Sequence, residues 1–473
     1  MTALRLVIPT LPAPPWLVYT ANLASDLLGL PQPMVIVGAD DGGRAEGPRI
    51  GYGVATLDQA PRIPRLPCAA DGAMVGVDLD CLGLGRRSVL VLRDTIEAGS
   101  GRVDLLFNLF SYVSCLAEWE HERASGSRQS YACRVRGDAA RYDRPWANYL
   151  LLALAEEIER AFPGSVDSSR KQARVYLTHD VDVLDKKLPT RAKDTARHLF
   201  NAARDLTRGR MGDAAGSLVQ AWRMVVDDND YFALRHIAAV EEARRVKSAF
   251  NVFTACRPSG FGEAWVSRLL DPTYDSGDDA RLRPVLDDLV AGGWEVGSHF
   301  AFHSWRDPAR MTAEIDGMRR RFGLERVRSC RQHWLRFSLG ETWAAQTQAG
   351  IEVDTTLGFN DRPGFRAGLA AAFRPYDHQR QAAHEILAIP TMLMDTQLYY
   401  SRKMSTAARH ERIATLLDQL IEVGGEACVI WHTHVFSPDH GWGQDYETLL
   451  DLIVAKGLAT ALPADVCSAT GRR

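Results

Sequence analysis

The chain has 473 residues and a formal net charge of -3; 46% of the residues are hydrophobic and 24% are charged, as is usual in soluble globular proteins. A chain of this length exceeds one ordinary domain, so we expect two. The charge excludes a strongly basic protein of the kind that binds nucleic acids or anionic membranes, and no apolar run approaches the roughly 18 residues of a membrane helix. We therefore expect no nucleic-acid partner and no insertion into a membrane.

Cysteine spacing and the first residues bear on the cellular compartment. The eight cysteines are scattered without a C-x-x-C pair, which favours reduced thiols over a disulfide framework or a zinc knuckle. Residues 1–15 lack the basic start, the continuous apolar stretch and the cleavage site of a secretory signal. Both observations predict a cytoplasmic protein.

Residues 1–144 are expected to form a small α/β domain. Short β-like runs alternate there with turns rich in Gly and Pro; the runs lie at 4–8, 34–37 and 88–92, and the turns at 40–43 and 61–67. No His, Cys or acidic pair in this part has the spacing of metal ligands, which favours a packing or oligomerisation role over substrate recognition. A helix that begins near Pro145 leads into a second domain, 145–473.

The second domain shows the rhythm of an α/β fold, because short apolar runs alternate with helical patterns. The runs lie at 175–177, 249–254, 294–297, 327–330, 351–354, 386–389 and 429–431. This alternation predicts a mostly parallel sheet or a barrel.

A long helical insertion, about 184–247, separates the first two of these runs. It carries a basic segment made of Lys186, Lys187, Arg191, Lys193 and Arg197. A solvated helix face is the simpler interpretation of these charges, and a lid that contacts a phosphorylated carrier is the alternative.

Two carboxylates follow the first run of the second domain. Asp180 and Asp182 are one residue apart, at the end of a predicted strand, where barrels and open α/β folds place their active sites. A turn or a helix cap accounts for one such Asp but not easily for both. This end of the strand is therefore a candidate site.

His299 and His303 are four residues apart, a spacing that directs two imidazoles to one side of a helical turn and recurs in metal sites. With Asp182 they would form a set of two His and one carboxylate that leaves positions open for water, as is typical of a catalytic metal site. The sequence therefore predicts a divalent metal ion held by these three residues.

Three further polar segments follow later strands. Arg331 stands in the first, and because a buried Arg needs an anion, Asp180 is its natural partner. The second, 354–366, concentrates Asp, Asn and Arg residues that a surface turn does not explain. The third ends a strand with His432 and His434, for each of which a hydrogen-bonded core histidine is the alternative interpretation.

The succession of an Asp pair, H-x-x-x-H, an Arg, an Asp and a final strand ending in aliphatic-x-His is spread over 178–434. It resembles the five motifs of the polysaccharide deacetylases (NodB homology, carbohydrate esterase family 4). The D-x-D spacing resembles one branch of the family, and 354–366 and 431–436 resemble a bacterial subgroup associated with surface-glycan gene clusters. The resemblance implies a distorted (β/α) barrel and removal of an acyl group from an amino sugar.

The resemblance also assigns roles to particular residues. Asp182, His299 and His303 would hold the divalent ion, commonly zinc in this family. Asp180 would be the general base that takes a proton from the attacking water, and His432 would protonate the departing amine.

Two further residues would support this chemistry. Arg331 would keep Asp180 ionised, and Asp354 would do the same for the protonated His432, each through an opposite charge. His434 is the alternative acid, but the spacing from Ile430 to His432 matches the family and favours His432.

Other side chains near the motifs are expected to contact the sugar by stacking or hydrogen bonding. They are Trp305, His333, Trp334, Asn360, Arg366, Trp431 and His434. For each Trp, a place in the core is the alternative. The chain departs from the family at 332–334, where a proline and an aromatic are usual, and in the fourth motif, which lacks the usual Trp.

The leading hypothesis is a cytoplasmic N-deacetylase that acts on an N-acylated sugar or small glycoconjugate. A second hypothesis keeps the fold and the metal but changes the substrate to a non-sugar or cyclic amide. A third, a non-catalytic glycan-binding or assembly protein, is disfavoured by the complete set of Asp180, Asp182, His299 and His303.

Overall fold

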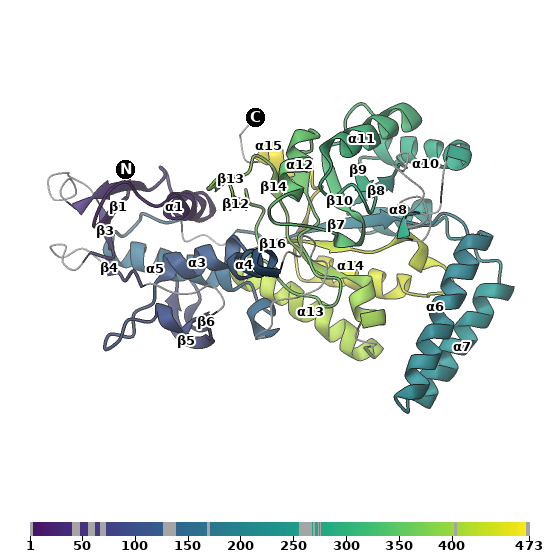
Figure 1. The fold of residues 1–473 in the computed structure, drawn as a ribbon, viewed down its shortest axis with the longest axis horizontal. Helices are drawn as coiled ribbons and strands as arrows, with labels where there is room; N and C mark the ends of the chain where they lie inside the picture. Colours follow the sequence, from purple (N-terminus) through teal and green to yellow (C-terminus); the bar gives the residue numbers. More distant parts are fainter. Residues whose placement is uncertain are drawn as a thin grey trace.

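The fold consists of a curled parallel sheet with a smaller α/β unit at one end of the molecule (Figure 1). The computed structural model describes residues 3–39, 48–54, 62–66, 72–125, 139–167, 171–254, 267, 270–272, 274, 276–401 and 404–469. In these residues, every helix is too short or too polar to cross a membrane.

The N-terminal unit is built on four short parallel strands in the order β2-β1-β3-β4. Its strands are β1 (Arg5–Ile8), β2 (Val35–Gly38), β3 (Arg49–Tyr52) and β4 (Arg62–Ile63), followed by a hairpin of β5 (Met74–Cys81) and β6 (Gly85–Leu92). Its helices are α1 (Pro15–Leu28), α3 (Leu105–Val113), α4 (Leu116–Ser125) and α5 (Trp146–Ala161), with short turns η1 (Arg93–Thr95) and η2 (Ala139–Tyr142). This part has the α/β character that the sequence predicts; the turn expected at 40–43 and both ends of 61–67 lie outside the described residues.

Helix α5 is the helix expected to begin near Pro145. It buries Leu150, Leu151, Leu154 and Ile158, which recur at helical spacing, and it packs against α3 and against the β5–β6 hairpin. The first helix of the predicted second domain therefore shares the core of the N-terminal unit. The domain limit at 144 stays a prediction.

The larger sheet is parallel throughout and follows the order β14-β11-β10-β9-β8-β7-β16-β15, with β17 also paired with β7. Its strands are β7 (Arg174–Val181), β8 (Ala249–Phe253), β9 (Glu295–Phe300), β10 (Ser329–Gln332), β11 (Val353–Asp354), β14 (Leu387–Ala388), β15 (Thr391–Met394), β16 (Glu426–Ile430) and β17 (Ala459–Thr460). Only residues 389 and 390 separate β14 from β15, so one bent segment pairs with β11 through its first half and with β16 through its second. The sheet therefore curls round on itself, which confirms the predicted distorted (β/α) barrel.

Helices cover the outside of this barrel. They are α8 (Leu234–Glu242), α10 (Asp279–Ala291), α11 (Pro308–Phe322), α12 (Thr342–Gln348), α13 (Thr406–Val423), α14 (Gly443–Ala455) and α15 (Asp465–Ala469); a small hairpin joins β12 (Tyr376–Asp377) to β13 (Ala382–Ala383). In α13, for example, the buried residues Ile413, Leu416, Leu417 and Leu420 form one apolar stripe.

Because all strands of the barrel are parallel, their carboxyl ends share one rim. Short turns follow several of these ends: η4 (His333–Leu335), η5 (Gln397–Ser401) and η6 (Thr433–Phe436); a further turn, η3 (Ser276–Asp278), precedes α10. This rim carries most of the residues singled out in the sequence.

The predicted insertion at 184–247 contains a helical hairpin of α6 (Leu188–Thr207) and α7 (Met211–Val226), which projects beside the barrel (Figure 1), followed by α8. Its basic segment is not simply a solvated face. Lys186 is buried and lies 2.7 Å from Asp439, and Arg191 lies 2.6 Å from Asp228. The side chains of Lys193 and Arg197 lie outside the described part.

Candidate active site

Strand β7 places Asp180 inside the barrel and Asp182 just beyond its rim. Asp180 is buried, and its Oδ1 accepts a hydrogen bond from Asn251 Nδ2 on β8 (2.9 Å). Arg331 Nε on β10 lies 3.7 Å from the same oxygen. The contact between Arg331 and Asp180 that the sequence predicts is present in the structure; Asn251 was not anticipated.

Two opposing effects act on the Asp180 carboxyl. Burial raises its pKa, but the positive charges of Arg331, His299 and His432 lower it, and the net shift is downward. Arg331 is itself fully buried and donates a hydrogen bond to Thr178 Oγ1 (2.7 Å). Asp180 is therefore held as a carboxylate that can accept a proton.

Asp182, His299 and His333 bring three possible metal ligands together. His299 Nε2 lies 3.1 Å and His333 Nε2 lies 3.8 Å from Asp182 Oδ1, and one ligand atom from each residue lies within 4.8 Å of the others. Asp182 Oδ1 and His299 Nε2 are buried and make no hydrogen bond to the described residues. Buried polar atoms rarely lack a partner, so this convergence fits a divalent cation with one oxygen and two nitrogen ligands.

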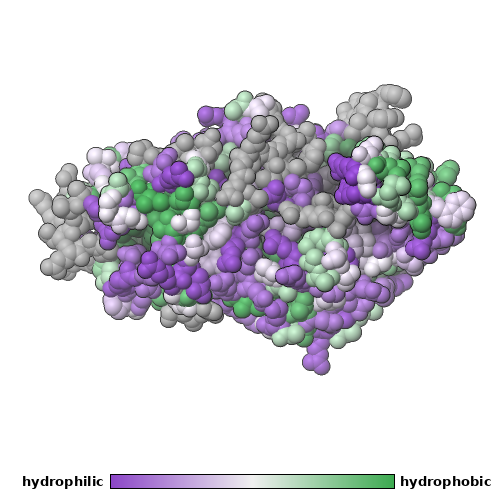
Figure 2. All heavy atoms as spheres, turned by 90° about the horizontal axis from the view of Figure 1, so that it is seen from below, coloured by the Kyte–Doolittle hydropathy of each residue, from purple (hydrophilic) through white to green (hydrophobic). Residues whose placement is uncertain are grey.

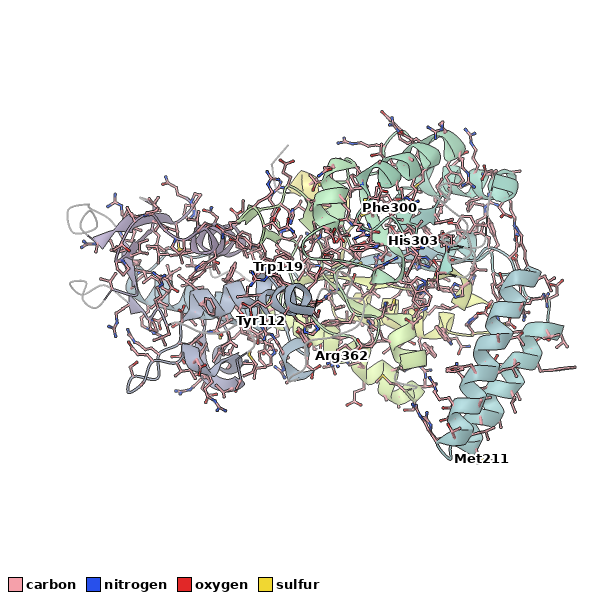
Figure 3. All side chains as sticks on the ribbon, viewed as in Figure 1. Tyr112, Trp119, Met211, Phe300, His303 and Arg362 are labelled. Carbon is pink, nitrogen blue, oxygen red and sulfur yellow. The ribbon has the colours of Figure 1, made fainter. Side chains whose placement is uncertain are left out.

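His303, the second predicted histidine ligand, is not part of this group of three. Figure 3 shows it near Phe300 in the barrel half of the molecule, and its ring contacts the Phe302 ring edge-on at 5.3 Å. His299 stands on strand β9 rather than on a helix, so the helical geometry assumed for the i to i+4 spacing is absent. Among the described residues, the structure brings His333, and not His303, to Asp182 and His299.

A further carboxylate supports the His333 ring. Asp271 Oδ1 lies 3.3 Å from His333 Nδ1 and accepts a hydrogen bond from the backbone N–H of Phe302 (2.7 Å). Such carboxylate–histidine pairs orient the imidazole of metal ligands. No pattern in the sequence points to Asp271, which stands outside any strand or motif.

His432 follows β16 and is held by the carboxylate of Asp395, the residue directly after the neighbouring strand β15. Its Nδ1 lies 2.8 Å from Asp395 Oδ1, and its backbone N–H donates to Asp395 Oδ2 (2.7 Å). Its Nε2 lies 3.6 Å from Asp182 Oδ2. Burial lowers the pKa of His432, but Asp395, Asp182 and Asp180 outweigh this effect and raise the pKa to about 10.

The predicted partner of His432, Asp354, does not contact it. Asp354 is buried at the end of β11, where it accepts hydrogen bonds from Trp343 Nε1 (3.0 Å) and Gln346 Nε2 (2.9 Å). The prediction was wrong because β15 went unrecognised. Its final residue precedes Asp395, so a carboxylate at a strand end, the signal used for Asp180, was present in the sequence.

Three predicted sugar contacts, Arg366, Trp431 and Trp305, are buried instead. Arg366 Nε donates to Glu118 of α4 (3.0 Å), which ties the barrel to the N-terminal unit. Trp431 is fully buried, and its ring lies 5.6 Å from that of Tyr446. Trp305 is also buried, so the core alternative holds for both tryptophans.

Trp334, Asn360 and His434 lie closer to the rim. Trp334 remains 46% exposed and adopts a φ of 60°, and Asn360 Nδ2 donates to its carbonyl oxygen (2.6 Å). The His434 ring lies 5.6 Å from that of His432. Burial and the charge of His432 lower the pKa of His434 to about 4, so His434 is neutral near pH 7.

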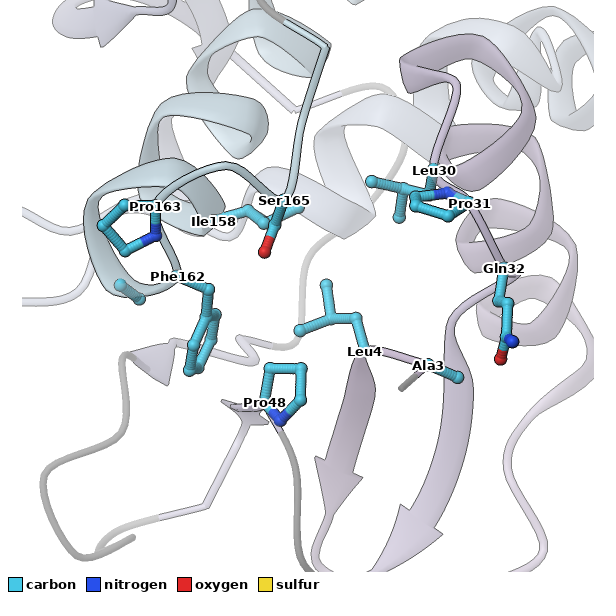
Figure 4. A pocket seen from close by; sticks show the side chains of 11 residues that line it. Ala3, Leu4, Leu30, Pro31, Gln32, Pro48, Ile158, Phe162, Pro163 and Ser165 are labelled. Atoms are coloured by element: carbon cyan, nitrogen blue, oxygen red, sulfur yellow. The ribbon is translucent and has the colours of Figure 1, made fainter. Parts of the chain in front are cut away.

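The N-terminal unit has a pocket of its own (Figure 4). It is lined by Ala3, Leu4, Leu30, Pro31, Gln32, Pro48, Ile158, Ala161, Phe162, Pro163 and Ser165. None of these side chains titrates or binds metals, so this pocket offers none of the chemistry found at the barrel rim.

No protein-family model and no curated protein matches the chain. Among solved structures, it is similar to a Mycobacterium smegmatis protein described as a "putative polysaccharide deacetylase" (14% identity, 64% of this chain and 91% of that chain, TM-score 0.37). It is also similar to a family 4 carbohydrate esterase from Bacillus anthracis (10%, 64% and 85%, TM-score 0.28) and to Agd3, described as a novel carbohydrate deacetylase (9%, 99% and 87%, TM-score 0.35). The proposals below rest on the geometry of the site.

Proposed function

We propose that this protein is a metal-dependent hydrolase that removes an acyl group from the nitrogen of an amino sugar. The observation that carries the proposal is the convergence of three parts on one barrel rim: the ionised Asp180, the Asp182–His299–His333 group and the protonated His432. Hydrolysis of an amide needs a base, an electrophile that polarises the carbonyl and an acid for the leaving nitrogen. The rim has a candidate for each.

Asp182, His299 and His333 would hold the metal, and their oxygen and nitrogen donors suit zinc. When bound, the ion would polarise the acyl carbonyl and acidify a water molecule. Asp271 would fix the orientation of His333 from the other side of its ring.

Asp180 would take the proton from the attacking water. Asn251 and Arg331 both contact its Oδ1, which leaves Oδ2 as the atom available to accept the proton. The charge of Arg331 keeps the carboxyl ionised despite its burial.

His432 would deliver a proton to the departing amine, because an amide nitrogen is a poor leaving group until it is protonated. Asp395 favours the protonated imidazole and fixes its orientation through two contacts. The neutral state of His434 favours His432 as the acid.

Trp334 supports a sugar as the substrate. Its exposed indole adjoins His333 and is held in an uncommon backbone conformation by Asn360. Strained backbone conformations are frequent at binding sites. The indole offers a flat apolar surface on which a sugar ring can stack.

The test combines metal analysis with a substrate screen. Protein purified without chelators should contain a stoichiometric divalent ion and, with added zinc, release acetate from a member of a panel of N-acetylated sugars, nucleotide sugars and short glycans. Asp180→Asn should retain the metal and lose activity by about 100- to 10,000-fold, as for a general base. Asp316→Asn, a half-exposed carboxyl on α11, is the matched control.

Two outcomes would contradict the proposal. Absence of any bound divalent ion would remove the metal-dependent reaction. Turnover of a ureide with no acetate release from any sugar would keep the hydrolase and replace its substrate.

A further inference from the structure

The α6–α7 hairpin exposes an extended apolar surface. Of the sixteen large hydrophobic side chains that are exposed in the described residues, ten belong to these two helices. This apolar hairpin face comprises Leu188, Leu199, Phe200, Leu206, Met211, Leu218, Val219, Trp222, Val225 and Val226. Figure 2 shows hydrophobic atoms gathered at the end of the molecule where the hairpin lies.

Helical spacing groups the exposed apolar residues of α7. Along α7, the exposed positions Met211, Leu218, Trp222 and Val225 follow each other at intervals of three, four or seven residues, which puts them on one side of the helix. The buried residues of α7 include Ala214 and Ala221. The exposed stripe is therefore separate from the side through which the hairpin packs.

The base of the hairpin is firmly attached to the barrel. Lys186 Nζ, just before α6, lies 2.7 Å from Asp439 and donates to the carbonyl oxygens of Arg223 and Asp227 at the end of α7 (both 3.0 Å). Arg191 also donates to the Asp227 carbonyl (2.9 Å). These contacts hold the hairpin away from the barrel, so the apolar face is presented outward.

The charge of the hairpin is opposite to that of the whole chain. Residues 188–226 contain seven Arg and Lys residues and three Asp, whereas the chain carries a net charge of -3. Arg208 and Arg210 are exposed in the turn between the helices, close to Met211 at the tip of the hairpin (Figure 3). The low net charge of the chain thus conceals a local basic surface.

We propose that the α6–α7 hairpin docks onto the surface of an anionic lipid bilayer. Helices that lie in a membrane interface combine Trp, Phe and Leu on one face with Arg and Lys around it, and they bind through buried apolar area together with attraction to anionic headgroups. The hairpin has both components. Docking of this kind needs no helix that spans the membrane.

Charge favours a bilayer over a second copy of the chain. A two-fold dimer formed through the apolar hairpin face would place the same surface of each copy against the other. Each copy would then bring a hairpin with seven basic and three acidic residues to the contact, and like charges repel. An anionic surface complements them instead.

The experiment is co-sedimentation of the full chain with large vesicles of phosphatidylcholine alone or with phosphatidylglycerol. Binding to the anionic vesicles is expected, with a loss of at least about tenfold in Phe200→Ser and again in Trp222→Ser, because each removes a large apolar side chain from the contact. Arg208→Glu should lower the preference for anionic over neutral vesicles and weaken binding more at low than at high salt.

Val290→Ser and Val454→Ser, exposed positions on α10 and α14, are the matched controls and should bind as the parent does. Equal loss in these controls, or no binding to anionic vesicles, would overturn the proposal. So would a dimer in light scattering that Phe200→Ser and Trp222→Ser convert to a monomer without any binding to vesicles. The assay contains no substrate, so its result is independent of the proposed hydrolase activity.

Discussion

The barrel rim and the apolar hairpin face depart from the usual burial pattern in opposite ways. At the rim, ionisable residues such as Asp180, His299 and Arg331 are buried; on the hairpin, Phe200 and Trp222 are about two-thirds exposed. Buried charge and a large exposed apolar surface are the two informative exceptions to ordinary packing. The charges of the rim mostly compensate one another, whereas the described chain offers nothing that covers the hairpin face. The proposed metal ion would complete the rim, and the proposed bilayer would cover the hairpin face.

The largest effect is expected from substituting His333, and the comparison is with the same substitution at His303. His333→Ala should abolish stoichiometric metal binding and reduce turnover to background, because it removes one of three converging ligands. His303→Ala should retain the metal. Metal content after dialysis, with turnover measured on the same samples, distinguishes the two variants. Metal loss in His303→Ala alone would restore the ligand set that the sequence predicts.

The second prediction concerns the base of the hairpin, where a buried charge pair links the two regions. Lys186→Met should lower the free energy of unfolding by about 3–5 kcal/mol, since it leaves Asp439 buried without its cation. Lys187→Met is the matched control, because Lys187 pairs with Asp278 while its side chain stays 45% exposed, and it should cost at most about 1 kcal/mol. Urea denaturation measures the free energy of unfolding of both variants. Equal losses would contradict a stabilising buried pair between Lys186 and Asp439.

Glu314 is buried like Asp180, but its pKa is raised whereas that of Asp180 is lowered. Burial raises the pKa of Glu314 from 4.5 to about 8, although hydrogen bonds from Ser304 and the Ala301 N–H oppose the shift. The folded chain therefore keeps a proton that the unfolded chain releases. Its contribution to stability is fully present below pH 4.5 and is lost as the pH rises through 8.

Between pH 5 and 8, this loss amounts to on the order of 3 kcal/mol. Glu314→Gln cannot titrate, so its free energy of unfolding should fall less over that interval than that of the parent. Urea denaturation of both proteins across the interval measures the difference. Parallel curves would show that Glu314 is ionised in the folded state.

A smaller effect is expected from removing the charge of Asp395, the carboxylate that contacts His432. Asp395→Asn should reduce kcat by about 10- to 100-fold, because it removes the charge that favours the protonated imidazole. Asp354→Asn should leave the pH dependence of kcat unchanged, because Asp354 contacts Trp343 and Gln346 instead. A pH profile for each variant separates a change in the acid from a loss of folded protein.

The sequence was sufficient to predict the barrel and much of its rim. Apolar runs mark most of its strands, and polar residues at strand ends identify Asp180, Asp182 and His432. Asp395 was missed because Pro390 interrupts the segment, so its second half was not recognised as a strand.

Other errors have a different physical origin. The H-x-x-x-H spacing was interpreted as helical, but His299 lies on strand β9, and His333, which joins it and Asp182, follows strand β10. Asp271 lies in no periodic element, so only the tertiary fold brings it to His333. The exposure of the apolar side chains of α6 and α7 also depends on the tertiary fold, because no other described segment packs over them.

The smallest expected effect tests whether the hairpin face contributes to folding at all. Phe200→Ser should change the free energy of unfolding by less than about 0.5 kcal/mol, since its side chain is 67% exposed. The same substitution at Phe300, which is fully buried on β9, should cost about 3–5 kcal/mol. Denaturation of both variants without lipid makes the measurement. A large loss in Phe200→Ser would mean that the side chain already packs within the protein, and the apolar face would then be part of its core rather than a surface for a membrane.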